Sequence, residues 1–240
     1  MKRKKISLYA ICMLMIITAV FVSVYRLTSS LTTYVNSMAP LKKNTVIVID
    51  AGHGDFDPGA VSNRVEEKGI NLDIALSLRD IFEAHGYIVI MTRTEDTTLA
   101  DNGPITSSSA KRADTCNRVA LVDALEDSVL ISIHQNAFHD HAQHGTQVFY
   151  GTQNSESELL AVSIQKSVIS KMQPDNKREA KKGTSSIYIL VKTKAPTVLV
   201  ECGFITNNAE REKLVDSNYQ RQIAYSIFLG YTDYEKNKEQ

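Results

Sequence analysis

The chain of 240 residues contains no tryptophan and only three cysteines. Cys12 lies in an apolar run near the start, which leaves Cys116 and Cys202, too few to form a disulfide scaffold. Both are expected to be small buried apolar residues. The sequence also lacks internal repeats, and nothing in its composition suggests disorder. With 43% hydrophobic and 22% charged residues, it is typical of a globular protein with one compact domain.

Neither sign of charge is in excess over the whole chain, which has 27 basic and 27 acidic residues. Four of the basic residues stand together at positions 2–5, before any acidic one. Residues 26–240 therefore carry 23 basic against 27 acidic side chains, a net charge of −4. Because phosphate binding needs a basic patch, this mildly acidic body argues against a nucleic-acid partner.

Residues 6–25 contain no charged side chain and are long enough to cross a bilayer as one helix. The basic tail at residues 1–5 should remain cytoplasmic, so we expect a single-pass membrane protein with its remaining residues outside the cell. The alternative is a cleaved signal peptide, which would make the protein secreted. The nearest small-residue site, Ser37-Met38-Ala39, lies well beyond the apolar run and precedes Pro40, which favours an uncleaved anchor.

Beyond the apolar run, residues 26–43 lack periodicity and are interpreted as a linker, residues 44–236 as the folded domain, and residues 237–240 as a polar tail. Within the domain, apolar patterns predict strands at 46–50, 87–92, 128–133, 146–150 and 197–200. They predict helices at 71–85, 111–125, 156–172, 208–215 and 219–234. Residues 94–109 are expected to form a long surface loop.

The alternation of strands and helices favours an α/β fold. We expect a single domain with a mostly parallel central sheet of about six strands and helices on both faces. An N-terminal transmembrane helix would precede this domain.

Three of the predicted strands lead into a side chain that can bind a metal or move a proton. His53 follows the first strand in a glycine-rich turn, His134 follows the strand at 128–133, and Glu201 follows the strand at 197–200. Because parallel strands place their carboxyl ends along one edge of the sheet, these residues should converge. Glu67 precedes the helix predicted at 71–85 and would project toward the same edge.

Two imidazoles and one carboxylate fill three positions of a tetrahedral zinc ion and leave the fourth to water, which is the pattern of a catalytic site. Zinc lowers the pKa of that water to about 7 and polarises a carbonyl under attack. A carboxylate outside the coordination shell can take the proton of the water and pass it to a leaving amine, and this role is assigned to Glu201. A glutamate at a strand end can instead cap a neighbouring helix, and that alternative stays open.

Six segments, in this order and spacing, resemble the zinc-dependent N-acetylmuramoyl-L-alanine amidases. They are Asp50-Ala51-Gly52-His53-Gly54, Asp57-Pro58-Gly59-Ala60, Glu67-Lys68, Thr92-Arg93, Ser132-Ile133-His134-Gln135-Asn136 and Val200-Glu201-Cys202-Gly203-Phe204-Ile205-Thr206-Asn207. The resemblance spans residues 45–234 and implies that His53, Glu67 and His134 bind Zn²⁺ and that Glu201 is the catalytic carboxylate. It also implies hydrolysis of the amide between N-acetylmuramic acid and L-alanine in peptidoglycan.

A membrane-anchored chain without cell-wall-binding repeats is most similar to the germination-specific branch of that family. This branch helps to form muramic-δ-lactam in the spore cortex, which implies a role in sporulation and germination. It also implies an extracytoplasmic lipoprotein as an activating partner. The residues leave the vegetative wall open as a substrate. Two other functions also stay open: a zinc peptidase or carboxypeptidase that acts on stem peptides, and a non-catalytic wall-binding module.

Several polar residues near the motifs have alternative interpretations. His139, His141 and His144 are expected to be solvated in a short polar loop rather than to bind a second metal. Glu66 competes with its neighbour Glu67 as a ligand, and the match to the family favours Glu67.

Other polar residues belong to the motifs themselves. Asn136 is interpreted as a contact for the substrate, although it could instead support the end of its strand. Arg93 and Arg118 are expected to form structural ion pairs. Asp50 either orients the His53 ring, as metal-bound imidazoles require, or closes the glycine turn by hydrogen bonding.

Overall fold

A computed structural model describes residues 13–15, 17–26, 45–100 and 107–238 of the chain. The chain divides after Lys42 into two units, of which the first contains helical residues at 13–15 and 17–26. Among the residues described, no helix has both the length and the apolar character that a membrane span requires. The predicted anchor at 6–25 lies partly outside the described residues. The basic tail at 1–5 lies wholly outside them, and of the linker at 26–43 only residue 26 is described.

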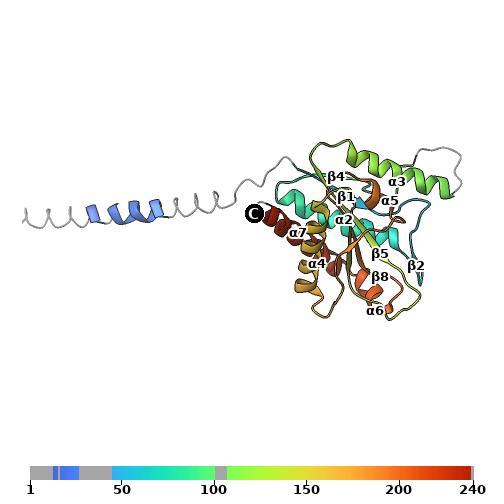
Figure 1. The fold of residues 1–240 in the computed structure, drawn as a ribbon. Helices are drawn as coiled ribbons and strands as arrows, with labels where there is room; N and C mark the ends of the chain where they lie inside the picture. The colour runs from blue at the N-terminus through green and yellow to red at the C-terminus, as the bar shows by residue number, and fades with distance from the viewer. Residues whose placement is uncertain (1–12, 16, 27–44, 101–106, 239–240) are drawn as a thin grey trace, which may run out of the picture. The chain divides into compact units, whose positions relative to one another are not determined.

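The second unit is built on a six-stranded sheet with the strand order β4-β1-β5-β8-β6-β7 (Figure 1). The strands are β1 (Val46–Ala51), β4 (Ile88–Met91), β5 (Ser128–Asn136), β6 (Gln147–Tyr150), β7 (Lys181–Lys182) and β8 (Thr197–Phe204). Strands β4, β1, β5 and β8 are parallel, whereas β6 runs antiparallel to β8. The predicted mostly parallel sheet of about six strands is therefore confirmed.

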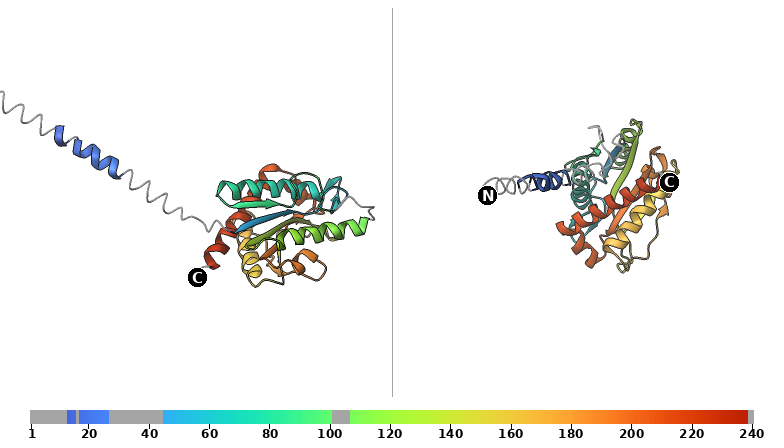
Figure 2. Two further views of the ribbon diagram at one scale, coloured as in Figure 1. Left: turned by 90° about the horizontal axis from the view of Figure 1, so that it is seen from above. Right: turned by 90° about the vertical axis from the view of Figure 1, so that its left-hand side faces the viewer.

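Helices cover both faces of this sheet, and Figure 2 shows α2 and α3 on opposite sides of it. The helices are α2 (Glu67–Ala84), α3 (Ser107–Asp123), α4 (Glu156–Met172), α5 (Tyr188–Lys192), α6 (Asn208–Leu214) and α7 (Ser217–Lys238). Apolar side chains of α2, α4, α6 and α7 share one core, and those of α3 and α5 share the other. This arrangement confirms the α/β fold.

Strand β1 shows why its sequence is continuously apolar. Ile47 and Ile49 belong to the core beneath α2 and α7, whereas Val48 between them belongs to the core beneath α3. All three side chains are fully buried. Because successive side chains of a strand point to opposite faces, a central strand covered on both faces needs apolar residues at every position.

Two elements begin earlier than the sequence pattern predicts. Helix α2 begins at Glu67 rather than at residue 71, so Glu67 lies in the first turn of the helix. Helix α3 begins at Ser107, so the end of the loop predicted at 94–109 is helical, while residues 101–106 lie outside the described part. The first turns of both helices are largely polar, so apolar periodicity does not reveal where the helices begin.

Three elements continue further than predicted. Strands β5 and β8 extend past residues 133 and 200 because they pair with each other, with His134 opposite Glu201. Helix α7 runs to Lys238 and so includes residues assigned to the polar tail. Lys238 forms an ion pair with Glu156 of α4 (2.8 Å), a contact between helices that sequence periodicity cannot reveal.

A small hairpin of β2 (Val61–Ser62) and β3 (Val65–Glu66) precedes α2 and was not predicted. Its two turn residues, Asn63 and Arg64, have positive φ angles of 49° and 65°. Positive φ at both central residues is the mark of a type I′ turn, which is usually made by Asn-Gly. Arg64 stands where glycine is usual, so the sequence does not show the Asn-Gly pair that would predict this turn.

Candidate metal centre

The chain turns sharply after β1, and this turn exposes His53 at the carboxyl edge of the sheet. His53 has a φ of 63°, a left-handed conformation that non-glycine residues seldom adopt. A Cβ atom at Gly52 would lie 2.2 Å from Nε2 of His134, so only glycine leaves room for that ring. Gly52 therefore leaves space for the His134 ring, and the turn that follows it exposes His53.

His53, Glu67 and His134 come together at this edge from the turn after β1, from α2 and from β5. The Oε1 atom of Glu67 lies 3.2 Å from Nε2 of His53 and 3.0 Å from Nδ1 of His134. Potential ligand atoms of the three residues all lie within 4.8 Å of one another. Within the described residues they form the one group of His, Cys, Asp or Glu that could hold a metal ion. This donor set fits zinc with one coordination position left open.

Glu67 is held in place by hydrogen bonds from neighbouring groups. Its Oε2 accepts from the main-chain N–H of Ala60 (2.8 Å), and its Oε1 accepts from the N–H of Gln135 (2.9 Å) and from Nδ2 of Asn71 (3.2 Å). Burial alone would raise the pKa of Glu67, but hydrogen bonds with His134 and His53 keep that pKa well below its usual range. The buried side chain is therefore a carboxylate, as a metal ligand must be.

The carboxylates around His53 also change its affinity for protons. Burial would lower the pKa of the imidazole, but hydrogen bonds with Asp57 and Glu67 outweigh burial and raise it to about 9. An environment that draws a proton onto an imidazole is negatively charged and is equally suited to a divalent cation. Metal and proton therefore compete for His53.

Asp57 contacts the nitrogen of the His53 ring that faces away from Glu67, and the sequence pattern assigned it no role. Its Oδ2 lies 2.8 Å from Nδ1 of His53, while its Oδ1 lies 2.6 Å from Nζ of Lys111. A carboxylate on the second nitrogen of a metal-binding imidazole fixes the orientation of the ring. The available signal was the position of Asp57 in the motif, four residues after His53.

Asp50 does not orient the His53 ring, so that interpretation is wrong. Its buried carboxylate accepts hydrogen bonds from Arg118 Nη1 (2.5 Å), Ser132 Oγ (2.5 Å) and Thr92 Oγ1 (2.8 Å). Burial alone would raise its pKa, but Arg118, with His134 and the Ser132 hydroxyl, lowers it to about 2. Asp50 instead anchors Arg118 beside the glycine turn.

Arg93 and Arg118 are both buried and both hold the main chain of the glycine turn. Arg118 pairs with Asp50 and Asp114, as predicted, and its Nη2 donates to the carbonyl of His53 (2.8 Å). The ion pair expected for Arg93 does not occur with any acidic side chain in the described part of the chain. Arg93 instead donates to the carbonyls of Ala51 (2.8 Å) and Gly52 (3.0 Å). Three carbonyls that point inward from a sharp turn are satisfied in this way.

Glu201 lies opposite His134, on the adjacent strand β8. Its Oε2 is buried and has no hydrogen-bond partner, and no helix cap by this side chain occurs among the described residues. Burial raises the pKa of Glu201 to about 7, although His134 partly opposes the shift. An unpartnered carboxyl group that titrates near neutrality suits general acid–base chemistry, because a proton can move either way.

A cavity of about 320 Å³ opens above these residues. His53, His134 and Glu201 line it from the sheet side, and Thr115 of α3 and Tyr188 of α5 line it from the other side. Asn136 is not among the lining residues, and its main-chain carbonyl accepts a hydrogen bond from Ile205 (2.8 Å). Its role in substrate binding therefore stays a prediction.

Other groups considered from the sequence lie apart from this centre. His139, His141 and His144 are exposed and do not belong to the metal-binding group. Glu66 is exposed and lies 3.6 Å from Nζ of Lys68.

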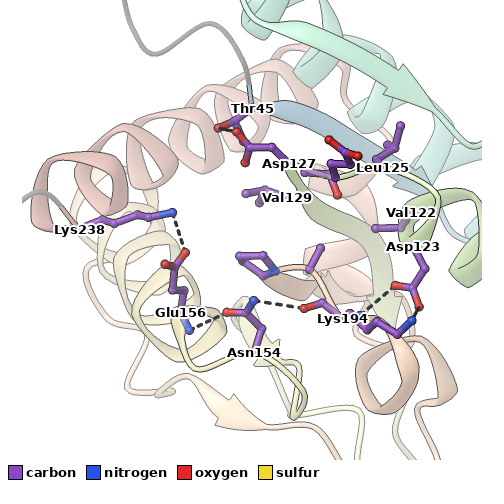
Figure 3. Close-up of a pocket in the computed structure, with 14 residues that line it drawn as sticks. Thr45, Val122, Asp123, Leu125, Asp127, Val129, Asn154, Glu156, Lys194 and Lys238 are labelled. Atoms are coloured by element: carbon purple, nitrogen blue, oxygen red, sulfur yellow. Dashed lines mark hydrogen bonds and ion pairs between the residues drawn. The ribbon is translucent and has the colours of Figure 1, made fainter.

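A second cavity, of about 400 Å³, lies at the ends where β5 and β8 begin (Figure 3). It is bordered by the Lys238–Glu156 ion pair and by Asn154, which donates to the carbonyl of Lys194. None of the predicted site residues lines it. The predicted ligands and Glu201 instead lie together at the carboxyl edge of the sheet.

Comparison with known proteins agrees with this geometry. Residues 47–233 match the family described as Amidase_3, N-acetylmuramoyl-L-alanine amidase. The germination-specific N-acetylmuramoyl-L-alanine amidase of Bacillus subtilis (strain 168) is 36% identical over 193 residues, which are 80% of this chain and 81% of that protein.

Solved structures give the same result. The CwlD amidase from Clostridioides difficile, solved in complex with the GerS lipoprotein, is 36% identical, with a TM-score of 0.78 over 81% of this chain and all of that one. An N-acetylmuramoyl-L-alanine amidase from Clostridium difficile 630 is 28% identical, with a TM-score of 0.70 over 82% of this chain. The chain therefore belongs to the N-acetylmuramoyl-L-alanine amidase family and is a hydrolytic amidase.

Proposed function

We propose that the chain is a zinc-dependent amidase that cleaves the bond between N-acetylmuramic acid and L-alanine in peptidoglycan. The observation that carries the proposal is the meeting of His53, Glu67 and His134 beside the unpartnered carboxyl group of Glu201. The catalytic domain comprises residues 44–236. His53, Glu67 and His134 would hold the ion, since they supply two imidazoles and an ionised carboxylate.

A zinc ion bound there would lower the pKa of water and polarise the carbonyl group under attack. The protein residues perform the proton transfers. Glu201 takes a proton from water as the water oxygen bonds to the lactyl carbonyl carbon, and it delivers that proton to the nitrogen of L-alanine as the C–N bond breaks. The products are a free lactyl carboxylate and a stem peptide with an intact L-alanine amino terminus.

The activity can be tested with the full-length chain purified in detergent and loaded with zinc. Digestion of peptidoglycan should release whole stem peptides that mass spectrometry identifies by their L-alanine termini. Glu201→Ala should abolish release at unchanged zinc content, while Glu212→Ala, at an exposed position on α6, should act as the wild type does. Turnover retained by Glu201→Ala would refute the assigned base.

The same digestion separates the amidase from the two alternatives. A zinc carboxypeptidase would free single amino acids from the carboxyl end of the stem peptide. A wall-binding module would retain affinity for peptidoglycan without releasing any product. The match of residues 47–233 to amidases favours amidase activity over the carboxypeptidase and the wall-binding module.

We further propose that the substrate is the spore cortex, where the amidase would act before muramic-δ-lactam forms. Support comes from the 36% identity to a germination-specific amidase. The test is to compare cortex from strains with and without this protein. Loss of muramic-δ-lactam in the deletion strain is the expected result, and an unchanged lactam content would point to the vegetative wall instead.

An extracytoplasmic lipoprotein is proposed as an activating partner. The support is the CwlD amidase, whose structure was solved together with the GerS lipoprotein. Co-expression of the chain with the lipoproteins of its own organism, followed by affinity capture and activity assay, tests this partner. Full activity of the chain alone would argue against it.

Residues 6–25 are proposed to anchor the protein in the cell membrane, with the catalytic domain outside and residues 1–5 inside. The support is the uncharged run that follows four basic residues. Fractionation and external protease treatment of intact cells should place the domain in the membrane fraction and make it accessible. A secreted form with a new amino terminus after residue 25 would show instead that the segment is a cleaved signal peptide.

A further inference from the structure

Helix α3 presents three residues to the glycine turn from one face. Lys111, Asp114 and Arg118 are spaced at i, i+3 and i+7, so they align along the helix. Lys111 contacts Asp57, Asp114 holds Arg118, and Arg118 donates to the carbonyl of His53. The helix therefore holds His53 at two points, through its main chain and through its ring.

His53 needs such support because its backbone is in the left-handed region, with a φ of 63°. A non-glycine residue remains in this region only when its surroundings hold it there. Arg118 Nη2 holds the carbonyl at 2.8 Å, and Asp57 Oδ2 holds Nδ1 of the ring at 2.8 Å. With both fixed, Nε2 of His53 is directed toward Oε1 of Glu67.

Asp57 can hold the ring only while its own carboxylate is fixed. Its second oxygen, Oδ1, lies 2.6 Å from Nζ of Lys111 and 3.2 Å from the main-chain N–H of Gly59. Apart from His53, Lys111 is the cationic side chain paired with Asp57 in the described part of the chain. The Asp57 side chain is 14% exposed and that of Lys111 is 50% exposed, so the ion pair is partly shielded from solvent.

We propose that Lys111 is a positioning residue of the metal centre. It acts through Asp57 to keep the His53 ring in the orientation that binds zinc, and it thereby strengthens zinc affinity. The inference rests on the proposed zinc site of His53, Glu67 and His134. It assigns to the first turns of α3 a function in metal binding, although α3 contributes no ligand.

The sign of the effect separates this role from simple electrostatics. Lys111 is a cation close to a site for another cation, so charge repulsion alone predicts that its removal tightens zinc binding. Positioning through Asp57 predicts the opposite, because the ring loses its fixed orientation. Zinc affinity measured on the metal-free protein therefore distinguishes the two without reference to catalysis.

The experiment measures the zinc dissociation constant of the full-length chain in detergent by competition with a chromophoric chelator. Lys111→Met should weaken zinc binding about 10-fold. This is the low end of the losses in metal affinity that follow mutation of residues that orient a metal ligand. Lys111→Arg should restore most of the affinity, since it keeps the ion pair. Lys166→Met, an exposed lysine on α4 across the sheet, should leave it unchanged.

A double variant tests whether Lys111 acts through Asp57. In an Asp57→Asn background, which already weakens zinc binding, Lys111→Met should cause no further loss. Matching thermal unfolding of the metal-free variants shows that the fold is intact, and Lys111→Gln replaces Lys111→Met should the latter unfold. Unchanged or tighter zinc binding by Lys111→Met would overturn the positioning role and leave the zinc site standing. Absence of zinc binding by the wild type would overturn both.

Discussion

Asp50 and Glu201 are two carboxyl groups of the same sheet whose surroundings differ. Asp50 is fully buried, whereas Glu201 is half-buried and lines a cavity. Asp50 accepts hydrogen bonds from Arg118, Ser132 and Thr92, and its pKa is lowered to about 2. Glu201 has a buried oxygen without a partner, and its pKa is raised to about 7. A satisfied carboxylate holds structure, whereas an unsatisfied one is free to exchange protons.

The two environments are supplied by the same strand. Ser132 of β5 lies opposite Asp50 of β1, and His134, two positions further along β5, lies opposite Glu201 of β8. Strand β5 therefore presents a hydroxyl to Asp50 and places a potential metal ligand beside Glu201, the proposed catalytic acid. Substitutions that change one of these two environments at a time should separate the roles of Asp50 and Glu201.

The largest effect is expected for Glu201→Gln, which keeps the shape of the side chain and removes its proton transfer. The rate of peptide release should fall by about 10³-fold, within the range for loss of a general base. Stability should not decrease, because the buried Oε2 of Glu201 has no hydrogen-bond partner that the change would remove. Release assays and urea unfolding of the same preparation check both parts, and a parallel loss of stability would contradict the comparison.

Asp50→Asn should instead act on stability. It leaves the buried Arg118 guanidinium without its main counter-charge, and breaking a buried pair in this way costs about 3–5 kcal/mol of unfolding free energy. Urea unfolding at neutral pH measures the loss. Asp114 still pairs with Arg118 in this variant, so part of the attraction remains. A loss of unfolding free energy below about 1 kcal/mol, as for an exposed ion pair, would show that Asp114 alone compensates the charge of Arg118.

The contribution of Asp50 should also depend on pH in a defined direction. Its pKa in the folded protein, about 2, lies below the ordinary value of 3.8, so folding favours the ionised form. Its stabilisation is then present above about pH 4 and is lost as the pH falls through 2, an amount of about 2 kcal/mol. The stability gap between the wild type and Asp50→Asn should narrow by this amount from pH 5 to pH 2, and a constant gap would contradict the shift.

Ser132→Ala should have the smallest effect, since it removes one of the three donors to Asp50. A hydrogen bond to a buried charged group is worth about 1.5 kcal/mol, and this loss should appear in urea unfolding. The rate of peptide release should remain near that of the wild type, because Ser132 contacts no predicted ligand. A strong loss of activity without loss of stability would show that the two carboxyl environments are coupled.

The positions of the proposed ligands and of the proposed catalytic carboxylate were predictable because their signals are local. His53, His134 and Glu201 each follow an apolar run, and parallel strands bring such positions to one edge. Glu67 was predicted to reach the same edge from a position just before a helix. It does lie at that edge, but within the first turn of α2, which begins earlier than expected.

The supporting residues were not predictable in the same way. Asp57, Lys111 and Arg118 meet around His53 from a turn and from a helix far along the chain. Several carboxylates lie close to His53 in the sequence. The path of the main chain through the turn places Asp57, and not Asp50, against Nδ1 of the His53 ring. The extensions of β5 and β8 likewise depend on mutual pairing, which neither strand encodes alone.

By itself, the order of residues determined the α/β class, the continuous apolar strands and the four side chains at the carboxyl edge, since burial on two faces and strand direction follow from local pattern. Only the tertiary structure decided which buried carboxyl group is satisfied and which is not. That distinction depends on donors brought together from distant parts of the chain, because a hydrogen bond exists only between groups that the completed fold places within reach.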